Sequence, residues 1–210
     1  MSVPKIKFCG FTRAEDIVLA AGLGVDYVGL VFAARSPRRV TLEQARSLRA
    51  AVPTGIGVVA LVMDTPADEV HAIAEALRPD VLQFHGGESD AFAAQFGLPY
   101  WKAVAMGGDP AAALARLGEH PRAQAFLFDG HAAGEPGGSG RRFDWAVLPT
   151  TLDRPFLLAG GLDAGNVAAA VALARPWGVD VSSGIEQAPG IKNPGRMRTF
   201  VAALRGKAGD

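Results

Sequence analysis

The sequence predicts an α/β fold, a (β/α)₈ (TIM) barrel of eight parallel strands that alternate with helices. Short β-rich runs recur eight times, and Ala- and Leu-rich stretches with helical spacing separate them. Several runs are apolar almost throughout, which suits strands buried on both faces of a parallel sheet. A doubly wound open sheet is the structural alternative. Composition and charge shift nowhere abruptly along the 210 residues, so we expect one domain spanning residues 1–210.

The predicted elements follow one another as strand, helix, strand, helix. The strands are Lys5–Cys9, Tyr27–Phe32, Ile56–Val62, Val81–Phe84, Tyr100–Val104, Ala125–Asp129, Phe156–Ala159 and Val179–Val181. Helical spacing is clear at Ala14–Leu23, Thr41–Ala51, Pro66–Leu77 and Ala111–Leu117. The predicted helix start signals are capping boxes at Thr12 with Glu15 and Thr41 with Gln44, a cap and proline at Thr65-Pro66, and caps at Ser89 and Asp163.

Composition narrows the classes of partner and compartment. Basic and acidic residues balance at 21 each, which leaves no electrostatic footprint for nucleic acid or an anionic membrane. The single cysteine excludes an intrachain disulfide framework and suits a reducing compartment. No stretch approaches ~18 apolar residues, and no signal peptide is apparent. We therefore expect a soluble, cytoplasmic protein with a small-molecule partner, either a monomer or a homodimer. The four histidines His71, His85, His120 and His131 show no paired ligand spacing, which predicts no metal.

In a barrel the residues after each strand share one mouth, where active sites are built. Cys9 ends the first strand, directly before Gly10. A helix N-terminus and the cations Lys7 or Arg13 could favour its thiolate. The alternative is a small buried hydrophobe, which free cysteine most often is.

Asp129 ends the sixth strand, beside the apolar run Ala125–Phe128. Such surroundings predict a raised pKa and a carboxyl that stays protonated and serves as a general acid. The alternative is an aspartate that only caps the following turn. With Cys9 across the mouth, Asp129 would complete an acid–base pair.

Other polar residues would surround this pair. Arg38 could clamp a carboxylate with its planar fork, whereas Arg39 beside it is expected to be solvated. Asp180 could orient a substrate hydroxyl or a catalytic group, or could merely tie loops together. Gln83 and His85 could hydrogen-bond within the mouth, although His85 also fits a loop histidine with satisfied partners.

Small-residue turns after the seventh and eighth strands predict a phosphate site. Gly160 and Gly161 follow one strand, and Ser183 and Gly184 follow the other. Backbone N–H groups at such turns approach anions closely, and barrels of this kind often bind phosphate there. The glycine-rich stretch within residues 130–142 predicts a lid, with a plain flexible loop as the alternative.

Taken together, these motifs resemble the phosphoribosylanthranilate isomerase family of tryptophan biosynthesis, over the chain from Lys5 to Lys192. The matching segments are Lys7-Phe8-Cys9-Gly10-Phe11-Thr12, Ser36-Pro37-Arg38, Gln83-Phe84-His85-Gly86, Asp129, Gly137 to Gly140 with Phe143-Asp144-Trp145, Gly160 to Leu162, and Val179 to Gly184. Phe8 and Phe11 replace aliphatic residues of the family pattern, and Gly130 replaces a small polar one.

The resemblance implies an Amadori rearrangement of N-(5-phosphoribosyl)anthranilate to the carboxyphenylamino-deoxyribulose phosphate. It assigns the general base to Cys9, the general acid to Asp129, the partner of the anthranilate carboxylate to Arg38, and phosphate contacts to Gly161 and Gly184. No metal or redox cofactor is implied, because the iminium nitrogen is itself the electron sink. A related phosphosugar barrel would use two aspartates as acid and base, or a lysine. The cysteine on the first strand argues against both. A non-catalytic phosphosugar-binding barrel would leave Cys9 and Asp129 dispensable.

Overall fold

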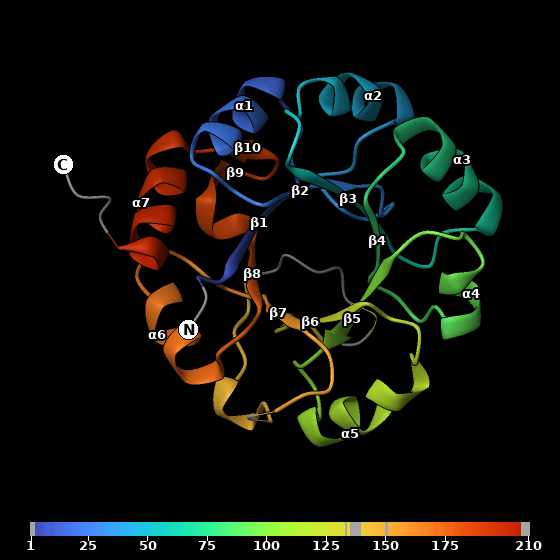
Figure 1. Ribbon diagram of the computed structural model, residues 1–210, viewed down its shortest axis with the longest axis vertical. Helices are drawn as coiled ribbons and strands as arrows, with labels where there is room; N and C mark the ends of the chain where they lie inside the picture. Colours follow the sequence, from blue (N-terminus) through green and yellow to red (C-terminus); the bar gives the residue numbers. More distant parts are fainter. Residues whose placement is uncertain (1–2, 133, 135–139, 150, 207–210) are drawn as a thin grey trace.

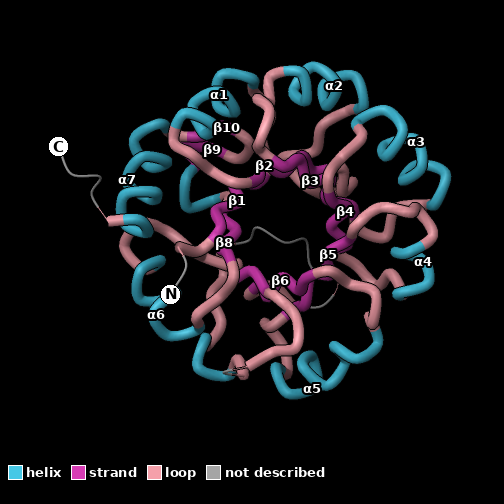
Figure 2. Tube along the Cα trace, in the orientation of Figure 1, coloured by secondary structure: helices cyan, strands magenta, loops and turns pink. Residues whose placement is uncertain are grey.

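The computed structural model describes residues 3–132, 134, 140–149 and 151–206. Eight parallel strands close into a barrel in which each pairs with its neighbour in sequence and β8 pairs with β1. Figures 1 and 2 show this ring of strands enclosed by an outer ring of helices. The predicted (β/α)₈ barrel is therefore confirmed, and the closed pairing excludes the open sheet.

Each strand and helix for which a range was predicted begins and ends within two residues of that range. The barrel strands are β1 (Lys5–Cys9), β2 (Tyr27–Val31), β3 (Gly57–Val62), β4 (Val81–Phe84), β5 (Tyr100–Ala105), β6 (Ala125–Asp129), β7 (Phe156–Leu158) and β8 (Gly178–Val181). The helices are α1 (Ala14–Gly22), α2 (Leu42–Ala50), α3 (Ala67–Leu77), α4 (Asp90–Ala94), α5 (Pro110–Ala115), α6 (Val167–Ala174) and α7 (Pro194–Arg205).

Two regions depart from a regular strand–helix alternation. Among the described residues between β6 and β7, helical structure is limited to the 3₁₀ turn η2 (Trp145–Val147). After β8 the chain forms the 3₁₀ turn η3 (Ser183–Ile185) and an antiparallel hairpin of β9 (Glu186–Ala188) and β10 (Ile191–Lys192) before α7 begins. A further 3₁₀ turn, η1 (Arg116–Glu119), extends α5. These short elements lack the periodicity that reveals longer ones.

The predicted helix caps are confirmed in part. Thr41 and Gln44 form a reciprocal capping box, and Ser89 accepts a hydrogen bond from the Phe92 N–H. The box at Thr12 is wrong, because its hydroxyl instead donates to the Gly190 carbonyl at 2.6 Å.

The other two start signals lie slightly too early in the sequence. Pro66 rather than Thr65 occupies the N-cap position of α3, and no side chain caps that helix. Asp163 supports a turn that precedes α6, where its Oδ1 accepts from the Gly165 N–H at 2.8 Å. The residue at the N-cap position of α6 is Asn166.

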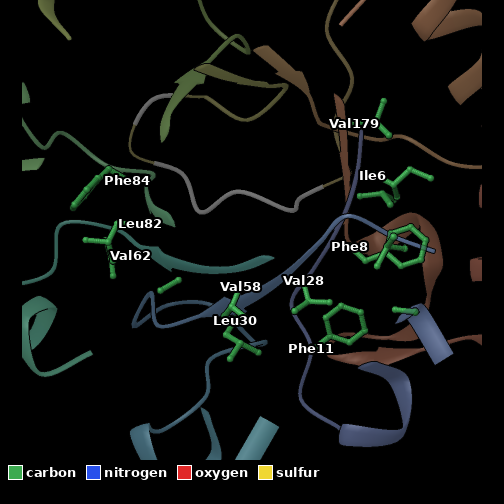
Figure 3. Close-up of a cluster of buried hydrophobic side chains, with 14 of the residues drawn as sticks. Ile6, Phe8, Phe11, Val28, Leu30, Val58, Val62, Leu82, Phe84 and Val179 are labelled. Atoms are coloured by element: carbon green, nitrogen blue, oxygen red, sulfur yellow. The ribbon is translucent and has the colours of Figure 1, made fainter. Parts of the chain in front are cut away.

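Side chains of the strands alternate between the barrel interior and the surrounding helices. The outer layer is apolar, and Figure 3 shows part of it, with Ile6, Phe8, Val28 and Leu30 among the labelled residues. Phe8 packs edge-on against Phe200 of α7, with ring centroids 5.8 Å apart. This layer buries the outer faces of the strands under the helices and so holds the barrel closed.

The interior is apolar at one end and polar at the other. At the amino-terminal ends of the strands, Trp101 packs against Tyr27 and Trp177, with ring centroids 5.0 and 6.0 Å away, and the latter two rings also contact each other. These aromatic rings fill the barrel there, so the functional side chains gather at the carboxyl ends. Within the described residues, no helix combines the length and apolarity needed to cross a bilayer.

Candidate active site

A pocket opens at the carboxyl ends of the strands and gathers most of the predicted site residues. Eight of the ten line it, namely Cys9, Arg38, His85, Asp129, Gly160, Gly161, Asp180 and Ser183. Gln83 and Gly184 are not among the residues that line it, and their contact with substrate stays a prediction. Apolar contacts from Val31, Leu61 and Leu162 complete the wall.

Cys9 lies at the end of β1, with its side chain inside the barrel mouth and only 4% of the residue exposed. Burial raises the pKa of its thiol, and the nearby Lys7 ammonium opposes that rise. Lys7 is fully buried in the same strand and forms an ion pair with Asp180 of β8 at 2.8 Å. Gly29 of β2 faces this group, and a Cβ at that position would lie 2.6 Å from the Cys9 sulfur. The thiol therefore has the Lys7 ammonium as a neighbour, and Gly29 leaves room for the sulfur because it has no side chain.

Asp129 ends β6 on the other side of the pocket and is 5% exposed. Its Oδ2 lies 3.6 Å from His85 Nε2 and 3.4 Å from His131 Nδ1, which are long contacts for hydrogen bonds. Burial favours the neutral acid, but the contacts with His131 and His85 outweigh it and lower the pKa of Asp129. The prediction of a raised pKa is therefore wrong, because it considered only the apolar strand.

His85 follows β4 and connects the pocket wall to a buried amide. Its Nδ1 lies 2.9 Å from Gln83 Nε2, and its Nε2 faces Asp129. Burial lowers the pKa of His85, so the neutral imidazole is favoured. With Gln83 donating to Nδ1, the ring proton resides on Nε2 and points at Asp129. Gln83 thus acts on the site through His85, and His85 is more than a loop histidine.

His131 is a site residue that the sequence reasoning missed. It is 2% exposed and its ring stacks on that of His85, with centroids 5.1 Å apart. The sequence argument considered only the spacing of histidines along the chain, whereas the fold brings together His85, directly after β4, and His131, shortly after β6. The pattern Asp129-Gly130-His131 directly after a strand was the available signal.

Arg38 lies at the pocket edge but is already engaged by a carboxylate. Its Nε and Nη2 donate to Glu186 at 2.9 and 2.7 Å, and Lys192 Nζ reaches the same carboxylate at 2.7 Å. The contacts with these cations outweigh burial and lower the pKa of Glu186. Glu186, which the sequence reasoning left without a role, therefore orients the Arg38 fork. The expected solvation of Arg39 is confirmed, since half of its side chain is exposed.

The predicted phosphate turns lie side by side at one edge of the pocket. Gly160 and Gly161 have φ of 84° and 63°, which only glycine adopts without strain. A Cβ at Gly184 would overlap the carbonyl oxygen of Leu162, so this glycine lets the two turns approach each other. Of the predicted lid, residues 133 and 135–139 lie outside the described residues.

Comparison with known proteins agrees with this geometry. The family model of N-(5'-phosphoribosyl)anthranilate isomerase matches residues 6–203. The enzyme of that name from Xanthomonas oryzae pv. oryzae is 53% identical over 206 residues, covering 96% of this chain and 93% of its own.

Solved structures of similar proteins have the same fold. Phosphoribosylanthranilate isomerase from Thermotoga maritima superposes with a TM-score of 0.88 at 29% identity, covering 97% of this chain and 99% of its own. A structure of phosphoribosylanthranilate isomerase in complex with reduced 1-(o-carboxyphenylamino)-1-deoxyribulose 5-phosphate gives 0.85 at 27% identity, with coverage of 97% and 99%. Because the family model spans residues 6–203 and the Xanthomonas enzyme is 53% identical over 96% of the chain, this protein belongs to the N-(5'-phosphoribosyl)anthranilate isomerase family.

Proposed function

We propose that this isomerase rearranges N-(5'-phosphoribosyl)anthranilate into 1-(2-carboxyphenylamino)-1-deoxyribulose 5-phosphate, a step of tryptophan biosynthesis, by general acid–base catalysis. The observation that carries the mechanism is the placement of Cys9 and Asp129 in one pocket. Asp129 would protonate the furanose ring oxygen and open the sugar to an iminium. Cys9 would then remove the proton from C2, and the enolamine formed would tautomerise to the ketone.

Because the pKa of Asp129 is lowered, the carboxyl needs to gain a proton before it can act as the acid. A phosphate and a carboxylate enter the mouth with the substrate, and like charges nearby raise the pKa of a carboxyl. The proton would come from solvent, because the neutral imidazole of His85, 3.6 Å from the carboxylate, has no acidic proton to give. Substrate binding would thus let Asp129 take up a proton before water leaves the pocket.

Cys9 needs the opposite shift, because only its thiolate can act as the base. The Lys7 ammonium is the group that most favours the thiolate, and Asp180 in turn holds Lys7 in place at 2.8 Å. The rearrangement transfers protons only, so Cys9 forms no covalent bond to the sugar in this mechanism. Asp180, which also lines the pocket, would contact the substrate hydroxyls.

Binding would use the two ends of the pocket. Arg38 presents its guanidinium at one side for the anthranilate carboxylate, while Glu186 fixes the orientation of its fork. Gly160, Gly161 and Ser183 would offer N–H groups to the phosphate at the other side. The related enzyme bound to a reduced product analogue supports a ligand of this class.

The mechanism is tested by turnover of freshly made phosphoribosylanthranilate, followed through the loss of anthranilate fluorescence. We expect Cys9→Ser and Asp129→Asn each to lose ~10²–10⁴-fold in kcat, the usual value of a general acid or base. The matched control is Asp68→Asn on the exposed face of α3, which should keep full activity. Full activity of both site variants would contradict the mechanism.

The phosphate site has its own test, which also bears on a non-catalytic sugar-binding barrel. A substrate lacking the phosphate should bind far more weakly in equilibrium titration, because the glycine turns would lose their anion. Equal binding of the two compounds would refute the assignment of Gly160, Gly161 and Ser183. A barrel that only binds would retain affinity for the phosphorylated compound and show no turnover.

Two further expectations remain proposals. The single cysteine suits a reducing compartment, which agrees with a cytoplasmic enzyme. The chain is proposed to be a monomer or a homodimer, a choice that light scattering of the purified protein would decide.

A further inference from the structure

Three donor atoms converge around the end of β6. His85 Nε2 and His131 Nδ1 lie 3.6 and 3.4 Å from the same oxygen of Asp129, and the donor atoms of all three residues lie within 4.8 Å of one another. We propose that this His–Asp–His cluster binds a divalent transition-metal ion, Zn²⁺ or Co²⁺, and that the bound ion inhibits the enzyme by occupying Asp129.

The nitrogen atoms of the cluster are buried and lack hydrogen-bond partners. Within the described part of the chain, neither His85 Nε2 nor His131 Nδ1 has a partner of hydrogen-bonding geometry, and their residues are 6% and 2% exposed. A buried ring nitrogen that faces a carboxylate needs either its own N–H hydrogen or a metal ion between the two atoms, because two lone pairs repel each other. The cluster holds two such nitrogens against a single oxygen.

The spacing suits metal coordination. Bonds of ~2.0–2.2 Å to nitrogen and oxygen in a tetrahedral zinc site place neighbouring donor atoms roughly 3.3–3.5 Å apart. The two separations from Asp129, 3.4 and 3.6 Å, are close to this value. Two imidazoles and one carboxylate also form a donor set that binds Zn²⁺ and other first-row ions.

The buried amide behind His85 supplies the support that a metal ligand needs. Gln83 Nε2 lies 2.9 Å from His85 Nδ1, and Gln83 Oε1 has no hydrogen-bond partner. If the amide turns over, Oε1 accepts a proton from Nδ1–H, and the lone pair of Nε2 becomes free for the metal. Ligand histidines usually donate their other N–H to such an oxygen. This change moves a proton between the ring nitrogens and leaves the imidazole neutral.

An ion can approach the cluster from two sides. His85 and Asp129 line the active-site pocket, while His85 and His131 line a second cavity that also contains Glu88 and Lys102. A metal on Asp129 removes the acid on which catalysis depends in the proposed function. Inhibition therefore rests on that function, whereas metal binding does not.

Binding is tested by titrating the full-length protein with Co²⁺ and recording its visible d–d spectrum, followed by displacement with Zn²⁺. We expect wild type to give the intense bands of tetrahedral Co²⁺. His85→Asn and His131→Asn should each weaken binding by at least the ~10–100-fold that loss of an outer-shell partner costs. His71→Asn, at an exposed position of α3, is the matched control and should bind as wild type does. Circular dichroism melts establish that each variant is folded.

Three outcomes would overturn the proposed site. These are a spectrum of octahedral Co²⁺ only, equal affinity in wild type and both cluster variants, or a sulfur-to-cobalt band that disappears in Cys9→Ser. The last result would place the ion on the thiol. Inhibition is measured separately, as the dependence of turnover on Zn²⁺. Tight binding without inhibition would leave the metal site standing and contradict the role of Asp129.

Discussion

At the scale of single residues, burial and the neighbouring charges of Lys7 and Asp180 set the pKa of Cys9. Lys7, which is fully buried, forms an ion pair with the largely buried Asp180 inside the barrel, next to Cys9. Lys7 lowers the pKa of Cys9, Asp180 raises it, and burial raises it most of all. The reactivity of the thiol thus depends on Lys7, which does not line the pocket, as well as on Asp180, which does.

Removing the cation should move the titration of the thiol. In Lys7→Met we expect a higher pKa of Cys9, because the remaining effects of burial and Asp180 both disfavour the thiolate. The double variant Lys7→Met/Asp180→Asn should titrate between wild type and Lys7→Met. The measurement is ultraviolet thiolate absorbance against pH, with Cys9→Ser as baseline, since the chain has one cysteine. Lys5→Met is the control, because Lys5 pairs with Asp26 at the exposed end of the strand. An unchanged thiol titration in Lys7→Met would contradict this account.

The residue types at the strand ends were predictable, whereas their electrostatic environment was not. Cys9, Asp129 and Asp180 each end or lie in a strand whose pattern is plain in the sequence. The pKa of Asp129 depends instead on His131, two residues further along the chain, and on His85, which directly follows another strand. Similarly, Glu186, the partner of Arg38, lies 148 residues further along the chain, in a hairpin too short to show a periodic pattern in the sequence.

At the scale of elements, local sequence specified some helix starts and tertiary contacts specified others. In the box at the start of α2, the Thr41 hydroxyl accepts a hydrogen bond from the Gln44 N–H, and the Gln44 side chain accepts one from the Thr41 N–H. Thr12 has similar local sequence around it, but its hydroxyl is drawn to the β9–β10 turn. A capping motif therefore predicts a helix start only where no tertiary acceptor competes for the side chain.

The capping box of α2 should make a measurable contribution to stability. Thr41→Ala removes the side-chain acceptor for the Gln44 N–H, and loss of an N-cap costs ~1 kcal/mol. Urea denaturation gives the free energy of unfolding. The control is Thr54→Ala, at an exposed position before β3, for which a change within ~0.5 kcal/mol is expected. Equal effects of the two substitutions would show that the box contributes nothing.

At the scale of the whole molecule, a buried ionic network joins the end of the barrel sequence to its beginning. Glu186 of β9 binds Arg38 from the loop after β2 and Lys192 of β10. Lys192 Nζ also donates to the carbonyl of Cys9, and Ser182 donates to the same oxygen at 3.0 Å. These contacts fix the active-site end of β1 against the segment that follows β8.

Breaking this network should destabilise the entire barrel. Glu186→Gln leaves Arg38 and Lys192 buried with a neutral partner, and losing one member of a buried ion pair costs ~3–5 kcal/mol. Thermal and urea unfolding would measure the loss. Glu69→Gln is the control, because Glu69 pairs with Arg39 in solvent at 3.5 Å and such pairs contribute ~0–1 kcal/mol. A similar loss in both variants would contradict the predicted importance of burial.

The ion pair of Lys7 with Asp180 joins residues 173 positions apart, and the contact of Lys192 with Cys9 spans 183. During synthesis, Cys9 leaves the ribosome early but does not acquire these neighbours until Lys192 has also emerged. The nascent chain thus carries an ordinary thiol, without its catalytic surroundings, for nearly the whole of translation. Catalytic competence would arise in one late step, when the last barrel strand closes against the first.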